Sequence, residues 1–295
     1  ASLDASGRMT GWYTKIACSS IIGQMAPQRI RNGLDTQACG SFADSPYTVP
    51  NQQVDYAMRN THVPVGFWRS VYHSQNPFFR ECFLDEVAHA AGKDPYEFRR
   101  TPLQGELAKR DLSILDTVAK AAGWGRTLPA GVHRGIAVAD AYGSYTAGVV
   151  EVAVDSKNRI ALKRVVIGVD PGYVVDVDAA KAQIEGGIIF ALSAIVYGEI
   201  TLADGRVTQR NFNDYRMLLL RDAPVIEAVP APTGGFWGGM GEPPMASVAP
   251  PPEHATAAAT GHRVPAPPPR QARYAPRPSA APATTAPPTP AGPPD

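Results

Sequence analysis

The placement of prolines limits how much of this 295-residue chain can fold. The chain has 29 prolines, and 15 of them lie in residues 250–295. That segment contains no Leu, Ile, Phe, Met or Trp, so it cannot offset the ~1–2 kcal/mol that ordering each residue's backbone costs. We therefore predict one folded domain over residues 1–264 and a disordered Pro/Ala-rich tail over residues 265–295.

Residues 250–264 form the C-terminal end of the predicted folded domain. Pro251 and Pro252 can occupy the first turn of a helix, where a missing backbone N–H costs nothing. The residues that follow lack the large apolar side chains with which a helix packs. We expect a weakly packed helix there.

Before the tail, helix-like and strand-like patterns follow one another without a regular strand–helix–strand period. This irregular order predicts an α+β domain rather than a doubly wound parallel sheet. Amphipathic or apolar helices are expected over 78–91, 112–122 and 179–197. Strands are expected over 135–139, 147–154, 160–169 and 225–229, with a turn at 155–158.

Two of these helices carry a specific expectation. In the helix over 78–91 the apolar side chains recur with helical spacing and should face the core: Phe79, Phe83, Val87 and Ala90. Arg80, Asp85 and Glu86 should then lie off that face. In the helix over 179–197, Gly186 and Gly187 each cost ~1 kcal/mol relative to Ala, so another segment should pack very close to them.

Composition and spacing exclude several classes of protein. The formal charge of +1 gives no attraction toward nucleic acid. Three scattered cysteines form no disulfide framework, and the histidines show no helical pairing that would assemble a metal site locally. The sequence has no Walker loop and no G-x-G-x-x-G after a strand. No apolar run reaches the ~20 residues of a membrane span, so no transmembrane segment is expected.

The most informative segment is the glycine-rich stretch that ends in Gly241, Glu242, Pro243 and Pro244. Glycines allow the backbone to approach a ligand closely, and the two prolines fix the backbone after Glu242. Glu242 is thus a candidate general base on a rigid mount. The alternative is a surface glycine loop with a solvated glutamate.

A second candidate is the loop 66–71, which carries Phe67, Trp68 and Arg69 just before a helix. Such a loop can bind a phosphate or oxo group. Alternatively, Arg69 stacks on Trp68 or pairs with Asp85. Gln183 on the apolar helix is a further polar candidate, with a satisfied core amide as its alternative.

Seven short motifs, in this order and at this spacing, resemble the molybdenum-binding subunit of the xanthine dehydrogenase and aldehyde oxidase family. The resemblance covers about residues 12–264 and is closest to the branch of isoquinoline 1-oxidoreductase beta subunits and related bacterial aldehyde dehydrogenases. The motifs are GFWRSVYHSQN at 66–76, FLDEVA at 83–88, GKDP at 92–95, VDPG at 169–172, QIEGG at 183–187, NFNDY at 211–215 and GEPP at 241–244.

The resemblance implies the C-terminal part of a molybdenum-cofactor-binding domain and a molybdenum hydroxylase activity. The cofactor would be molybdopterin or its cytosine dinucleotide form, and the substrate an aldehyde or an N-heteroaromatic compound that receives oxygen from water. Electrons would leave through 2Fe-2S clusters on a partner iron–sulfur subunit. Glu242 would be the catalytic base, with cofactor contacts from Phe67, Trp68, Arg69, Gln183 and Gly241. No side chain of this chain would ligate the metal.

The chain also departs from the family pattern. The family's molybdenum domain is longer, and its N-terminal half has no counterpart here, so the isolated chain is expected to be inactive. The alternative is a truncated or degenerate, non-catalytic fragment that serves at most as a docking piece for a partner subunit. The compartment, cytoplasmic or periplasmic, is left open.

Overall fold

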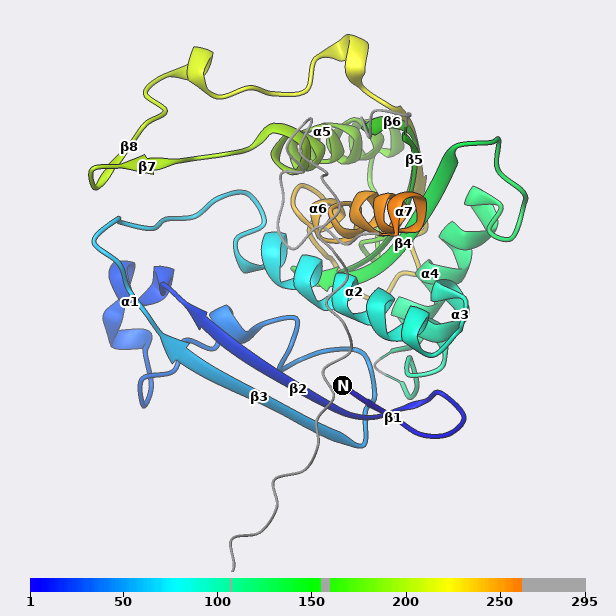
Figure 1. Ribbon diagram of the computed structural model, residues 1–295, viewed down its shortest axis with the longest axis horizontal. Coiled ribbons are helices and arrows are strands. Elements are labelled where there is room, and N and C mark those ends of the chain that lie inside the picture. Colours follow the sequence, from blue (N-terminus) through cyan, green and yellow to red (C-terminus); the bar gives the residue numbers. More distant parts are fainter. Residues whose placement is uncertain (107, 155–159, 262–295) are drawn as a thin grey trace, which may run out of the picture.

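The structure, a computed structural model, describes residues 1–106, 108–154 and 160–261. A three-stranded sheet, a four-stranded sheet, a small two-stranded hairpin and the helices make up this described part (Figure 1). The turn predicted at 155–158 and the disordered tail predicted over 265–295 lie outside the described residues.

The smaller sheet is built from the N-terminal strands β1 (Ser2–Leu3), β2 (Met9–Cys18) and β3 (Asn51–Met58), in that order. β1 and β2 are antiparallel, whereas β2 and β3 are parallel. The parallel pairing requires a long crossover, which contains α1 (Ile21–Met25) and the 3₁₀ turns η1 (Pro27–Arg29) and η2 (Gln37–Cys39).

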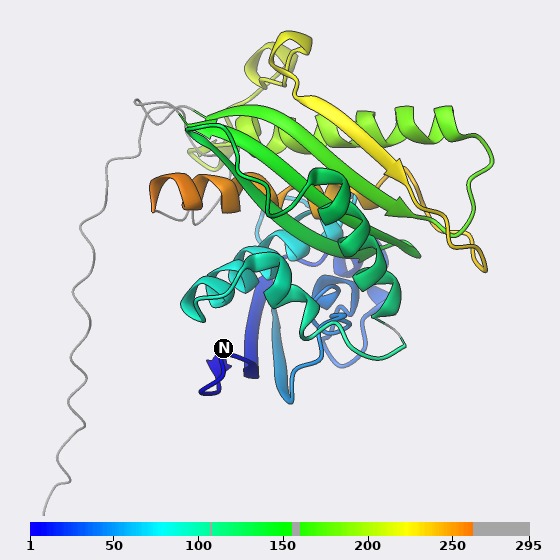
Figure 2. The same cartoon turned by 90° about the vertical axis from the view of Figure 1, so that its right-hand side faces the viewer.

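The larger sheet has the order β4 (Val132–Ala141), β5 (Ser144–Val154), β6 (Ile160–Asp170) and β9 (Val225–Pro230). The first three strands are antiparallel neighbours, and β9 joins β6 in parallel. Figure 2 shows β9 beside the green strands, with α5 running along the sheet. The α+β prediction is confirmed.

Helices cover both faces of the larger sheet. One face packs against α4 (Lys109–Ala122), and the other against α5 (Val177–Tyr197), α6 (Pro243–Val248) and α7 (Pro250–Thr260). The chain between α5 and β9 carries β7 (Leu202–Ala203), β8 (Arg206–Val207), η3 (Phe212–Asp214) and η4 (Leu220–Asp222).

Helices α6 and α7 lie very close to the sheet. A Cβ added at Gly148 would stand 2.6 Å from the carbonyl oxygen of Ser247, and one at Gly135 would stand 2.3 Å from that of Pro251. All residues from Pro250 to Ala257 are buried. The expectation of a weakly packed helix after Pro250 is therefore wrong, because the backbone of α7 at Pro251 and the side chain of His254 lie directly against Gly135 of β4.

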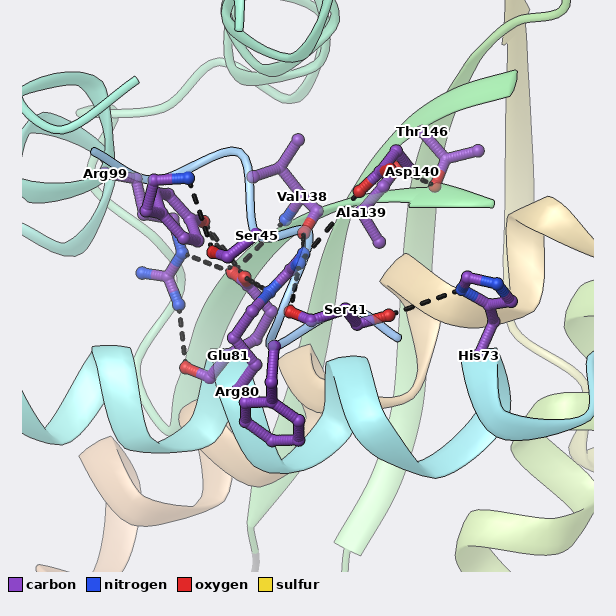
Figure 3. A network of polar contacts seen from close by, with 12 residues as sticks. Ser41, Ser45, His73, Arg80, Glu81, Arg99, Val138, Ala139, Asp140 and Thr146 are labelled. Atoms are coloured by element: carbon purple, nitrogen blue, oxygen red, sulfur yellow. Dashed lines mark hydrogen bonds and ion pairs between the residues drawn. The ribbon is translucent and has the colours of Figure 1, made fainter. Parts of the chain in front are cut away.

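Helix α2 (Tyr72–Ala90) starts earlier than the sequence indicates, and its apolar spacing is misleading. Phe79 is 50% exposed and Ala90 is exposed, whereas Arg80 and Asp85 are buried. The cause is a network of buried charges at Glu81, which meets Arg80 on its own helix and Arg99 on α3 (Pro95–Arg100) (Figure 3). Because of these ion pairs, the side of α2 that carries Arg80 and Glu81 is buried.

By length and composition, α5 is the one helix of the described part that could cross a membrane. This corrects the expectation that no apolar run is long enough. Its Ile184, Ile188 and Leu192 are fully buried in the core cluster that includes the strands β5 and β6. Such burial against a sheet is typical of a core helix in a folded domain. The absence of a transmembrane segment stays a prediction.

Candidate functional site

Three segments that are remote in sequence meet beside the middle of α5: the loop 66–71, the stretch of α5 from Gln183 to Phe190 and the glycine-rich loop before α6. Arg69 Nε and Nη2 both donate to the carbonyl oxygen of Gly241, the former at 2.9 Å. A Cβ on Gly187 would lie 3.5 Å from both Arg69 Nη2 and the Gly241 carbonyl oxygen. These are ordinary van der Waals distances, and a Cβ on Gly186 would meet nothing within 4 Å, so the very close packing predicted at the double glycine is wrong.

The backbone of the loop 66–71 holds the side chain of Glu242. The Ser70 N–H donates to Glu242 Oε1 at 2.7 Å, and Ser70 Oγ lies 3.3 Å from the Glu242 carbonyl oxygen. Ser70 and Val71 have positive φ values of 76° and 46°, which side chains of their kind rarely adopt. Backbone strain of this kind persists only where surrounding contacts enforce it, and it gathers at functional sites.

The glycine-rich loop is not a free surface loop. The Gly239 N–H donates to the Tyr142 carbonyl oxygen at 2.9 Å, and Ser144 Oγ donates to the carbonyl oxygen of Gly239 at 2.5 Å. A Cβ on Gly238 would stand 2.2 Å from Ser144 Oγ. The loop is therefore fastened to the β4–β5 turn, and the alternative of a solvated glutamate on a surface loop is wrong.

The alternatives for Arg69 are also wrong. Its guanidinium lies 5.6 Å from the centre of the Phe190 ring and is bonded to Gly241, so it neither stacks on Trp68 nor pairs with Asp85. Asp85 lies 3.7 Å from the buried Arg99 instead. It is Trp68 that stacks on Phe190, with ring centres 4.9 Å apart.

Gln183 and Phe67 are accessible to solvent beside this cluster. Gln183 is exposed rather than a core amide, and its Nε2 would lie 2.7 Å from a Cβ on Gly241. Phe67 is 57% exposed. The structure therefore brings Arg69, Gln183, Gly241 and Glu242 together, with Trp68 held at their side by Phe190.

Sequence reasoning missed the residues on the other side of Glu242. Burial and the negative charge of Glu242 raise the pKa of Tyr142 to about 12, so this phenol keeps its proton at neutral pH. The Tyr142 ring lies 5.1 Å from that of His73, whose pKa is lowered, chiefly by burial. The Tyr-Gly pair at 142–143 was the available signal, because both residues have the positive φ of a tight hairpin turn.

Helix α2 is bonded both to Ser41, in the crossover between β2 and β3, and to strand β4 of the larger sheet. His73 Nδ1 lies 3.3 Å from Ser41 Oγ, while Arg80 donates to the carbonyl oxygens of Ser41 and Val138 at 2.9 and 3.0 Å (Figure 3). Because the loop 66–71 runs directly into α2, these bonds also fix where the Ser70 N–H points.

This arrangement fits a bound anionic or oxygen-rich cofactor. Among the described residues no hydrogen bond is formed by the Gln183 amide, which stands exposed beside Gly241. A larger residue than glycine at 241 would occupy the space in front of that amide. An amide donor and a backbone without a side chain therefore lie side by side, next to the carboxylate of Glu242.

Comparisons with known proteins show which proteins this sequence resembles. The sequence matches two molybdopterin cofactor-binding domain families, over residues 3–103 and 89–224. It is 32% identical over 283 residues to a membrane-bound aldehyde dehydrogenase [pyrroloquinoline-quinone] of Gluconacetobacter polyoxogenes, covering 84% of this chain and 35% of that protein. It is 29% identical to the isoquinoline 1-oxidoreductase subunit beta of Brevundimonas diminuta, covering 90% of this chain and 34% of that protein. The chain thus spans about a third of these curated relatives.

Solved structures share the fold. Quinoline 2-oxidoreductase from Pseudomonas putida 86 superposes with a TM-score of 0.70 at 12% identity, over 88% of this chain and 58% of that one. Aldehyde oxidoreductase from Desulfovibrio gigas gives a TM-score of 0.63 at 14% identity, over 86% and 45%.

Proposed function

Because this chain belongs to the molybdopterin-binding subunits of the xanthine dehydrogenase and aldehyde oxidase family, we propose that it is part of a molybdenum-cofactor-dependent hydroxylase. The substrate class is an aldehyde or an N-heteroaromatic compound, with water as the oxygen source. Electrons pass to an iron–sulfur subunit with 2Fe-2S clusters. The proposal is supported by the names of the relatives, which include an aldehyde dehydrogenase, an isoquinoline oxidoreductase and a nicotinate dehydrogenase subunit.

The observation that carries this proposal is the Ser70–Glu242 hydrogen bond. It holds Oε1, so Oε2 is the atom left to accept a proton from the oxygen that attacks the substrate. Tyr142, which keeps its own proton, does not compete for that role at neutral pH. A fixed carboxylate with one uncommitted oxygen is what a general base requires.

The cofactor contacts follow from the same cluster. The Gln183 amide can donate a hydrogen bond to the cofactor, and the backbone at Gly241 leaves room for it. Arg69 acts indirectly, since both of its bonds hold the Gly241 carbonyl in place. Phe67 and Trp68 offer exposed ring surface at the rim. The molybdenum–pterin group, when bound, supplies the two-electron redox chemistry that no side chain here can provide.

The test is Glu242→Gln in the complete gene product, purified with its iron–sulfur partner. Glutamine keeps the shape and can still accept from the Ser70 N–H, but it cannot take a proton. Turnover of aldehydes and N-heteroaromatics should fall by at least ~10²-fold, the lower range for loss of a general base. Molybdenum and pterin content per subunit should be unchanged.

Glu185→Gln is the matched control. Glu185 is an exposed glutamate that lies near Gln183 on α5 and carries no assigned role. Retained turnover in Glu242→Gln would refute the assignment of the base. A wild-type preparation that never contains molybdenum would instead favour the non-catalytic docking fragment.

A further inference from the structure

Away from this cluster, helices α2 and α7 bring together three side chains of metal-ligating type. One ligand atom each from Cys82, Glu253 and His254 lies within 4.8 Å of the other two. Glu253 and His254 are only 6% and 3% exposed, and Cys82 is half-buried. No spacing rule could have found the set, since Cys82 lies far from the other two in the sequence.

The surroundings of His254 determine which ring nitrogen can bind a metal. Its Nδ1 lies 3.1 Å from the carbonyl oxygen of Ile136 and 3.6 Å from Asp85 Oδ1. A carbonyl oxygen can only accept, so Nδ1 carries the proton and the lone pair of the neutral ring is on Nε2. A histidine whose Nδ1–H is oriented by a carbonyl and a carboxylate is the arrangement typical of metal-ligating histidines.

The third ligand lies in an apolar setting. Cys82 packs against the buried side chains of Phe78, Ile195 and Ala249. A low-polarity shell strengthens the attraction between a cation and its ligands. A thiolate, an imidazole and a carboxylate together are a mixed S, N and O set, which suits Zn²⁺ better than Mg²⁺ or Ca²⁺.

We propose that Cys82, Glu253 and His254 bind a Zn²⁺ ion that joins α2 to α7. The ion needs only small side-chain movements, because ligands ~2.0–2.3 Å from a tetrahedral centre stand roughly 3.5 Å apart, and the present ligand atoms already lie within 4.8 Å of one another. Water completes the coordination. The site does not depend on the molybdenum proposal, and it links α7, which is joined to Glu242 through the short helix α6, to α2, the helix that follows Ser70.

The experiment uses the full chain, freed of metal and titrated with Co²⁺, whose complexes with thiolates absorb strongly in the near ultraviolet. We expect saturation at one Co²⁺ per chain and loss of the absorption when Zn²⁺ is added. Cys82→Ser should abolish the thiolate band. Cys18→Ser is the matched control, since Cys18 is also a half-buried cysteine but lies on β2.

His254→Gln tests the second ligand through competition with a chromophoric chelator, and it should weaken Zn²⁺ affinity at least tenfold. Circular dichroism of each variant separates loss of a ligand from loss of the fold. Absence of saturable Co²⁺ binding by the wild-type chain overturns the proposal, as does a thiolate band that persists in Cys82→Ser. A wild-type affinity that His254→Gln leaves unchanged also overturns it.

Discussion

The backbone N–H of Ser70 donates a 2.7 Å hydrogen bond to Glu242 Oε1 across 172 positions of sequence. The donor belongs to a residue with φ of 76°, and the acceptor follows a run of glycines. Neither segment could hold this geometry alone: the loop needs α2, and the carboxylate needs the β4–β5 turn that fastens its own loop. The site is therefore a joint product of two distant parts of the chain.

Gly241→Ala should lower cofactor content without unfolding the protein. The new Cβ would lie 2.7 Å from Gln183 Nε2, so the flexible glutamine side chain moves away. Its amide can then no longer donate a hydrogen bond to the cofactor. Molybdenum and pterin per subunit, measured in the complete gene product, should fall several-fold. Gly186→Ala, which touches nothing within 4 Å, should leave both unchanged. Full cofactor content in Gly241→Ala would remove Gln183 from the binding site.

Substitution by alanine should change the free energy of unfolding in opposite directions at two glycines of the site, Gly186 and Gly238. At Gly186 the helix gains propensity without a clash, so Gly186→Ala should raise the free energy of unfolding by ~0.5–1 kcal/mol. At Gly238 the methyl would collide with Ser144 Oγ and the Gly143 backbone, so Gly238→Ala should lower it by ~1–3 kcal/mol. Denaturant unfolding measures both. Equal effects at the two positions would contradict the described packing of the glycine-rich loop.

Glu81→Gln should be strongly destabilising. Glu81 is fully buried and accepts hydrogen bonds from Arg80 Nε at 3.1 Å and Arg99 Nε at 2.9 Å. Removing its charge leaves two buried guanidinium groups short of a partner, at a cost of ~3–5 kcal/mol. The exposed Glu97, which pairs with Arg100 on α3, is the control, and Glu97→Gln should change stability by less than ~0.5 kcal/mol.

The stability of the chain should fall as pH rises from about 4 to about 8. Burial and the neighbouring charge of Asp140 raise the pKa of Asp111 to about 8, and its Oδ1 has no hydrogen-bond partner among the described residues. In this window the folded chain holds a proton that the unfolded chain, with Asp near ~3.9, has lost. The unfolded state binds fewer protons, so the free energy of unfolding decreases with pH, by at most ~1.4 kcal/mol per unit.

Asp111→Asn should remove this dependence and leave the protein more stable than wild type at pH 8. The measurement is denaturant unfolding at pH 5 and pH 8. Asp116→Asn serves as the control on the same helix, because Asp116 is partly exposed and pairs with Arg100. An unchanged pH profile in Asp111→Asn would show that other groups cause the dependence.

Features with local causes were predictable from the sequence. Asp94 caps α3 with two hydrogen bonds to backbone N–H groups, and Gly123 ends α4 in the left-handed conformation. Both follow from residue types that act within one turn of the chain. The strands β4, β5, β6 and β9 were likewise evident from runs of apolar and β-branched residues.

Features that depend on contacts between distant parts of the chain were not predictable from the sequence. The inward side of α2 could not be recognised because Arg80 and Glu81 are buried only through partners on other elements, such as Arg99 and Val138. Glu242 could be named from its motif, but its partner Ser70 could not, since a positive φ at a serine has no sequence signal. The packing of α7 was missed because its closest approach to the sheet is at Gly135 of β4 rather than through large apolar side chains.

The parallel pairing of β6 with β9 has a consequence for how the molecule assembles. The β4–β5–β6 part of the sheet joins strands that are close in sequence, but β9 can dock only after the whole segment from Pro171 to Pro224 has been brought round. Closing this connection costs more conformational entropy than closing the short β4–β5 turn, so the contacts of β9 should form after those of β4 and β5. The glycine-rich loop and Glu242 follow β9 directly. We therefore expect refolding to yield first a collapsed three-stranded species without the Ser70–Glu242 bond, and the site only in the slowest phase.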